Sequence, residues 1–228
     1  MLVLTDLTRF KDNDNVCMAL LDENDCTCYR PLPYATRAFV AEKKLLPGMI
    51  VDAAVTAHEN ASSPHIEDCT FENEIWLDRL DEENFKDVLE RSAVDSVAQA
   101  FEGKITSKNR CVPADSPCQQ SIKTIRVEPL SLNLSVVDCG EEQKIRIGFT
   151  DLAGDTYRYT PISDLHFHAA ALEYVKQDRL DELNALLAGG EVVYIRSGLS
   201  RLYESKNGKQ GFWMQANGIY SFPGCFLI

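Results

Sequence analysis

Short apolar runs separated by polar turns dominate the first third of the chain. The runs cover residues 2–4, 16–21, 26–32 and 49–57, and acidic or Asn-rich clusters such as 22–25 separate them. Short runs between turn-forming residues indicate β-strands, and many such strands in succession are typical of small barrels and sandwiches. This pattern predicts a first β-domain, an OB-like barrel, over residues 1–78.

A helical pattern follows residue 78. Apolar side chains recur every four residues, at Phe85, Leu89, Ala93, Val97 and Phe101. This spacing predicts one helix over 83–101 that packs against a barrel, or alternatively offers a surface to a partner. Residues 103–122 contain two prolines and little periodicity, which predicts a surface loop. Residues 79–122 are therefore interpreted as a helix plus a polar linker.

The last hundred residues return to a β pattern. Strand-like runs cover 122–127, 130–137, 144–150, 156–160, 191–199 and 212–216, and residues 164–188 have the pattern of one or two helices that end at Gly189. This order predicts a second OB-like barrel over residues 123–228 with a helical insert. Its apolar end, with Phe222, Phe226, Leu227 and Ile228, is expected to dock on the domain. The predicted fold class is mainly β with minor α.

The hairpin over residues 144–160 has the clearest alternation in the chain. One face is apolar and is predicted to form the core: Ile145, Ile147, Phe149, Tyr157 and Tyr159. The opposite face is cationic: Lys144, Arg146 and Arg158. A row of cations can follow a phosphate backbone, so this face is a candidate binding site for an oligonucleotide.

The charge of the chain narrows the classes of partner. The formal net charge is −12, and residues 1–78 carry 6 basic and 14 acidic side chains. Non-specific coating of DNA requires many Lys and Arg contacts to phosphates, so that function is disfavoured. A local basic groove and an acidic N-terminal third that meets a basic protein partner both stay open.

The pattern of apolar runs and the spacing of the cysteines predict a cytoplasmic protein. No apolar run approaches the ~20 residues that cross a bilayer, and an acid follows the first five residues, so neither a membrane span nor a signal peptide is expected. The eight cysteines are scattered without C-x-x-C spacing. Free thiols are therefore expected rather than a zinc site or a disulfide framework.

Motifs for catalysis are absent from the sequence. It contains no phosphate loop, dinucleotide fingerprint or nucleophile elbow, so we predict no catalytic residue, no metal and no cofactor. His65, Glu67 and Asp68 form one exception, because an extended chain would place His65 and Glu67 on one face as an acid–base or metal pair. The alternative is a polar loop that bonds to itself. His166 and His168 would point apart on a helix.

Two further groups of cations are candidate anion contacts. Arg30 follows Tyr29, so its planar fork could grip a phosphate or carboxylate beside a stacking surface, or it could form a structural ion pair. Lys104, Lys108 and Arg110 lie in the predicted loop, where either a ligand contact or simple solvation fits.

Five segments in order along the chain carry a resemblance. They are 15–19 (NVCMA), 29–31 (YRP), 47–51 (PGMIV), 64–68 (PHIED) and 217–223 (NGIYSFP). Together they resemble the bacterial dual-OB-domain family, and the last segment is the most distinctive. The resemblance implies two linked OB folds and, by analogy of fold, binding of nucleic acid or of a nucleotide-like ligand.

The sequence thus predicts a non-catalytic protein that binds single-stranded nucleic acid or a nucleotide, with a prokaryotic defence or mobile-element system as a candidate setting. The candidate ligand contacts are Tyr29, Arg30, His65, Glu67, Lys144, Arg146 and Arg158. The first alternative is an acidic subunit of a larger complex. The second is a hydrolase centred on His65, Glu67 and Asp68.

Overall fold

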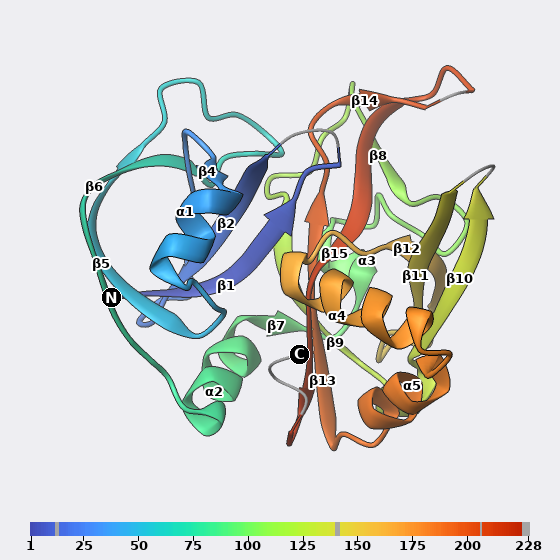
Figure 1. The fold of residues 1–228 in the computed structure, drawn as a ribbon. Coiled ribbons are helices and arrows are strands. Elements are labelled where there is room, and N and C mark those ends of the chain that lie inside the picture. The colour runs from blue at the N-terminus through green and yellow to red at the C-terminus, as the bar shows by residue number, and fades with distance from the viewer. Residues whose placement is uncertain (12–13, 140–141, 206, 225–228) are drawn as a thin grey trace.

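The computed structural model describes residues 1–11, 14–139, 142–205 and 207–224, and shows two β-rich lobes side by side (Figure 1). Strands form most of the regular structure, which confirms the predicted mainly β class. No helix in these described ranges is long and apolar enough to cross a membrane. Phe222 is buried, whereas Phe226, Leu227 and Ile228 lie outside the described residues.

The first lobe is a closed five-stranded barrel with the connectivity of an OB fold. Its strands are β1 (Leu2–Arg9), β2 (Asn15–Asp22), β3 (Cys28–Pro31), β5 (Met49–Ala57) and β6 (Asp68–Arg79). β1 pairs with both β2 and β5, which closes the ring, and β3 runs parallel to β6. Beside the barrel lie the short β4 (Ala35–Thr36) and α1 (Arg37–Lys43), between its third and fourth strands. This is the strand order of small Greek-key barrels.

The second lobe repeats this order with a divided first strand. Its elements are β9 (Ile122–Val127), η1 (Pro129–Ser131), β10 (Asn133–Cys139), β11 (Glu142–Thr150), β12 (Thr156–Pro161), β13 (Val192–Leu199) and β15 (Gln210–Phe222). β9 pairs with β13, and β10 pairs with β11, so β9 and β10 together act as one bent strand. Pro129 lacks a backbone donor and occupies the bend. A parallel bridge between Ile162 and Ala216 joins the β12 end to β15.

The prediction of one or two helices over 164–188 is confirmed by the helical insert of the second lobe. It forms α4 (Leu165–Lys176) and α5 (Leu180–Ala188). The side chain of Asp164 accepts hydrogen bonds from the backbone N–H groups of His166 and Phe167, which caps α4. Gly189 follows α5 as its C-cap.

The single helix predicted over 83–101 is wrong. The segment forms α2 (Glu82–Ser92), then β7 (Ala93–Val94), then α3 (Val97–Ala100). A step of four residues overshoots one helical turn by about 40°, so four steps wind the apolar stripe about 160° around a helix. The chain instead breaks at Ala93, where β7 pairs in parallel with β9. The predicted burial of Phe85, Leu89, Val97 and Phe101 is confirmed.

The prediction of a surface loop over 103–122 is also wrong in part. Ile105, Val112 and Cys118 are buried in the core of the second lobe, and Cys111 is also buried. β8 (Cys111–Pro113) pairs with β15, whose outer end also pairs with β14 (Tyr203–Glu204). The polar residues around these apolar ones masked the short strand.

The hairpin of β11 and β12 matches its predicted faces except at Tyr159. Ile145, Ile147, Phe149 and Tyr157 are buried as predicted. The register shifts between Ile147 and Phe149, and Tyr159 has a φ of 57° and is 56% exposed. The irregular backbone therefore turns Tyr159 out of the core.

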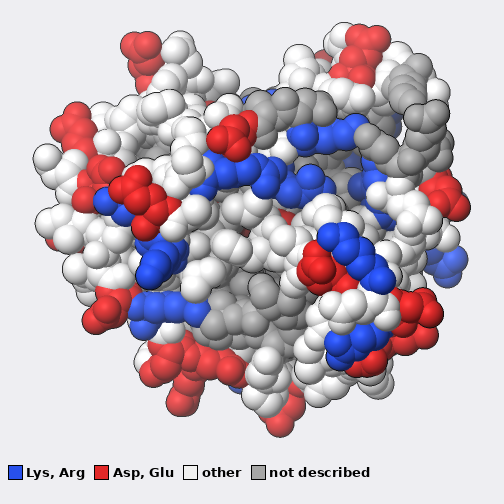
Figure 2. Space-filling model, in the orientation of Figure 1, with Lys and Arg blue, Asp and Glu red and all other residues white. Residues whose placement is uncertain are grey.

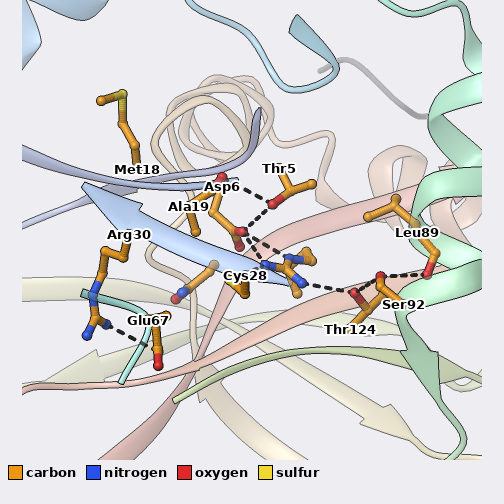
Figure 3. A network of polar contacts seen from close by, with 12 residues as sticks. Thr5, Asp6, Met18, Ala19, Cys28, Arg30, Glu67, Leu89, Ser92 and Thr124 are labelled. Atoms are coloured by element: carbon orange, nitrogen blue, oxygen red, sulfur yellow. Dashed lines mark hydrogen bonds and ion pairs between the residues drawn. The ribbon is translucent and has the colours of Figure 1, made fainter. Parts of the chain in front are cut away.

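The two lobes share a core and a buried polar network. Phe85, Val88 and Leu89 of α2 pack with Val3 of the first lobe and Tyr194 of the second in one apolar cluster. Figure 3 shows Thr5 and Asp6 on one side of the polar network, with Thr124 and Ser92 on the other.

Arg196 of β13 is the centre of this network. Its Nη2 lies 2.8 Å from Asp6 Oδ2, and its Nη1 donates to Thr124 Oγ1 over 3.0 Å. The hydroxyl of Tyr220 donates to the carbonyl of Thr5 over 2.5 Å. Both lobes therefore supply partners to the same buried groups, which fixes their relative position.

Candidate ligand cleft between the two lobes

A cleft of about 890 Å³ opens where the end of β1 faces β11, α4 and the β13–β15 edge. This volume lies within the range of small-molecule sites in proteins. Figure 2 shows Lys and Arg side chains gathered across the middle of this face, between the lobes, while Asp and Glu are spread around the outer parts. The cleft is therefore a basic region on an acidic protein.

Arg9 and Arg146 give the cleft charges that no acid in the described part of the chain neutralises. Both side chains line it and are half-buried, and neither has an acidic partner within 4 Å among the described residues. The backbone N–H of Arg9 donates to the carbonyl of Ser163 over 2.8 Å, which fixes the end of β1. The buried Nε of Arg9 has no hydrogen-bond partner. An arginine in this state is ready to bind an anion.

The electrostatics of neighbouring groups support this description. Burial lowers the pKa of Arg9, and the charges of Arg37 and Arg146 lower it further. Burial, together with Arg9, Arg146 and Arg37, lowers the pKa of His168 on α4 to about 4. Burial and then the charge of Arg146 also lower the pKa of Arg110. The field in this part of the cleft is therefore strongly positive.

A second set of cations in the cleft wall is neutralised. Arg201 donates to Asp68 through Nη1 over 2.7 Å and Nη2 over 3.0 Å, and through Nε to the hydroxyl of Tyr34 over 2.7 Å. Arg30 Nε donates to Asp68 Oδ1 over 2.6 Å. Burial alone would raise the pKa of Asp68, but the hydrogen bonds from Arg201 and Arg30 outweigh it and lower the pKa. These residues build the wall.

Aromatic side chains line the same cleft. They are Phe10, Tyr34, Tyr203 and Trp213. The rings of Phe10 and Tyr34 lie 4.8 Å apart between centroids, and Tyr203 is 57% exposed. Nucleobases stack on such faces, each contact contributing about 1–3 kcal/mol. The cleft thus combines uncompensated charge with stacking surfaces.

The structure separates the cations that the hairpin pattern grouped together. Lys144 and Arg146 line the cleft, whereas Arg158 is exposed on β12 outside the lining. The register shift in the hairpin explains the difference. The carbonyl of Arg158 accepts a hydrogen bond from Arg110 Nη1.

The Tyr29 and Arg30 pair does not form one binding surface. Arg30 is 3% exposed and lines the cleft, but its guanidinium is held by Asp68, with Glu67 3.8 Å from Nη1. Tyr29 is half-buried against the core of the first lobe and outside the cleft lining. The structural ion pair is thus the arrangement that Arg30 adopts.

His65 and Glu67 lie buried at the junction of the lobes. The ring of His65 meets that of Phe212 edge-on at 5.5 Å between centroids, and burial followed by the charges of Arg30 and Arg201 lowers its pKa to about 3. The carboxylate of Glu67 accepts hydrogen bonds from the backbone and hydroxyl of Ser121, and burial raises its pKa. Neither residue lines the cleft.

Candidate metal ligands do not converge in the parts of the chain that the structure describes, where no three His, Cys, Asp or Glu side chains form a group that could hold an ion. His166 and His168 point to different partners. His166 Nε2 lies 3.2 Å from the carbonyl of Leu45, whereas His168 lines the cleft. The cysteines whose side chains the structure describes are free thiols, as expected: Cys17, Cys26, Cys28, Cys69, Cys111 and Cys118.

Several cleft residues were not among the sequence-based candidates. Arg9, Arg201 and Trp213 lie at strand ends or edges that only the packing of two lobes brings together. One signal was available: residues 9–11 read Arg-Phe-Lys, an aromatic between two cations. That pattern suits nucleic-acid contacts, although it is short and common.

The comparisons with known proteins give no family assignment. A scan against protein-family models found no match, and a search of the curated proteins found no significant match.

Proposed function

We propose that this protein is a non-catalytic binding protein for single-stranded nucleic acid or a nucleotide, held in the cleft between the two OB-like lobes. One observation carries the proposal: Arg9 and Arg146 line this cleft without acidic partners among the described residues, in a chain of net charge −12. Uncompensated arginines in a half-buried cleft raise the free energy of the unliganded protein, because their charges are partly desolvated and repel each other. An anionic ligand removes that cost.

The aromatic lining favours an anion that carries a nucleobase over other classes of anion. A carboxylate or an inorganic anion would use the arginines alone, whereas the aromatic side chains of the cleft, among them the 57% exposed Tyr203, can also contact a base. OB folds commonly bind oligonucleotides across such surfaces. The binding function that the dual-OB resemblance implies is therefore consistent with this cleft. A base with a phosphate fits both groups of residues.

The acidic remainder of the surface predicts a localised mode of binding. Negative charge outside the cleft repels a long polyanion, so few phosphates would be contacted. For single strands the logarithm of the affinity falls with the logarithm of salt by about 0.7 per phosphate contact. A short contact tract therefore gives a shallow salt dependence.

The first prediction tests the arginines. Arg9→Ala with Arg146→Ala should weaken the binding of a labelled single-stranded oligonucleotide at low salt by about tenfold or more, because hydrogen bonds to charged groups contribute about 1.5–3 kcal/mol each. The salt slope should also fall, by about 0.7 per lost contact. Fluorescence anisotropy at two salt concentrations measures both quantities.

Arg158→Ala is the matched control, since it removes an arginine from the neighbouring strand outside the cleft. It should bind like the wild type. Equal weakening by Arg158→Ala would show that only net charge matters, and wild-type protein that binds no oligonucleotide or nucleotide at low salt would refute the proposed function.

A second candidate function, an acidic subunit that binds a basic protein, has its own observation. β6 pairs with β3 only at Asp68 and Cys69, so its later part has a sheet partner on one side. Ile75 and Leu77 are 59% and 40% exposed there, among the acids Glu72, Glu74 and Asp78. An open strand edge with exposed apolar side chains can accept an extended basic peptide. This candidate takes first place if nucleic-acid binding fails.

A further inference from the structure

Three side chains from three elements converge on one part of the cleft. Arg9 is the last residue of β1, Arg146 lies on β11, and His168 lies on α4. All three line the cleft. Since β1 belongs to the first lobe while β11 and α4 belong to the second, this group exists only in the docked arrangement.

The cations around this group outnumber the acidic partners that the described residues provide. The charge of Arg37 lowers the pKa of both Arg9 and His168. The charge of Arg146 also lowers the pKa of the nearby Arg110, after burial. Where the structure describes both partners, only Arg37 of these cations pairs with an acid, the largely exposed Asp14 at 3.7 Å. The buried Arg9 Nε keeps an unused donor. The local field therefore favours a ligand with more than one negative charge.

A phosphomonoester meets this requirement better than a phosphodiester. It carries about −1.5 to −2 charges at pH 7 and three terminal oxygens, whereas a diester linkage carries one charge. Arginine forks bind such oxygens through paired hydrogen bonds. The neutral imidazole of His168 can donate one more hydrogen bond.

We propose that Arg9, Arg146 and His168 form a seat for a terminal phosphate, so that the cleft prefers nucleotides or strand ends that carry a phosphomonoester. The inference rests on the proposed function and deepens it, because it names the part of the ligand that this group recognises. The aromatic side chains that line the cleft, among them the exposed Tyr203, would then contact the base next to that phosphate.

The experiment compares three oligonucleotides of one sequence, with a 5′-phosphate, with a 3′-phosphate, and with hydroxyls at both ends. One phosphorylated form should bind wild-type protein about tenfold more tightly than the hydroxyl form, as expected for added hydrogen bonds between charged groups. The two phosphorylated arms distinguish which strand end enters the seat.

Variants locate the preference. His168→Gln and Arg146→Lys should each abolish most of the difference between phosphorylated and hydroxyl strands while the hydroxyl strand still binds, since Lys keeps the charge but loses the planar fork. Arg158→Ala should keep the full difference. Melting temperatures confirm that each variant is folded.

The outcomes separate the two proposals. If wild-type protein binds all three oligonucleotides equally, or if both cleft variants keep the preference, the phosphate seat is overturned and the proposed function survives. If none of the three binds, both fail.

Discussion

At the scale of single residues, the partner of each arginine decides its role. Arg30 and Arg146 both line the cleft, but Arg30 is held by Asp68 while Arg146 has no acid within 4 Å in the described chain. Both are arginines on β-strands, so residue type does not distinguish them. The difference arises because Asp68 lies on β6, which runs beside β3. We therefore propose that Arg9 and Arg146 bind the ligand, whereas Arg30 has a structural role.

A second prediction concerns Asp164. Burial, reinforced by the charge of Asp6, raises the pKa of Asp164 to about 7 although backbone donors at α4 oppose the shift. The folded protein therefore keeps this proton in a range where the unfolded chain, with its usual carboxyl pKa near 4, has lost it. Stability from this group is full below pH 4 and is lost as the pH rises towards and past 7.

Asp164→Asn removes this dependence, because Asn stays neutral and its Oδ1 can still cap α4. Relative to wild type, the variant should gain about 2.5 kcal/mol of stability between pH 5 and pH 8, because about two of the three pKa units between the unfolded and folded values lie in this range. Urea unfolding at the two pH values measures this, and Asp81→Asn at the exposed cap of α2 is the control. Parallel curves for wild type and Asp164→Asn would contradict the assignment.

At the scale of elements, strands in which apolar and polar residues alternate could be predicted, whereas strands with an irregular burial pattern could not. The strand over 49–57 is confirmed as β5, and the hairpin of β11 and β12 is confirmed except at Tyr159, which the register shift turns out of the core. β6 was missed because residues 72–75 are all exposed and give no two-residue period. α1 is short and buries only Val40, so it left no helical stripe.

The cleft could be predicted only in part, since it depends on contacts between distant residues. Lys144 and Arg146 follow from the alternation of their strand. Arg9 and His168 join them through the docking of β1 on the 163–164 segment, where Arg9 bonds to Ser163 and Thr8 bridges to Asp164. Such pairing across more than 150 residues leaves no periodic signal in one sequence.

A third prediction tests why α2 and α3 are separate helices. The hydroxyl of Ser96 accepts a hydrogen bond from the backbone N–H of Gln99 over 3.1 Å and caps α3. Ser96→Ala should lower the free energy of unfolding by about 1 kcal/mol, the usual loss for a missing N-cap. Ser96→Thr keeps the acceptor and should stay close to wild type in chemical denaturation. An unchanged Ser96→Ala would mean that packing alone places α3.

At the scale of the whole molecule, the docked lobes create the cleft. Arg196 with Asp6 and Tyr220 with Thr5 hold the lobes through buried contacts. The apolar cluster around Phe85 and Leu89 adds a shared core. This junction holds the cations of one lobe at a fixed position relative to the cations and aromatic rings of the other. Such an arrangement suits a site that is formed before its ligand binds.

The most direct test of this account is to map where a single-stranded oligonucleotide touches the protein. Ultraviolet cross-linking to an oligonucleotide at low salt, followed by peptide mass spectrometry, should place cross-links on the aromatic residues of the cleft: Phe10, Tyr34, Tyr203 and Trp213. Arg9→Ala with Arg146→Ala should reduce them. Cross-links confined to Tyr29 or Tyr159, which lie outside the cleft lining, would contradict the central claim that the ligand binds between the lobes.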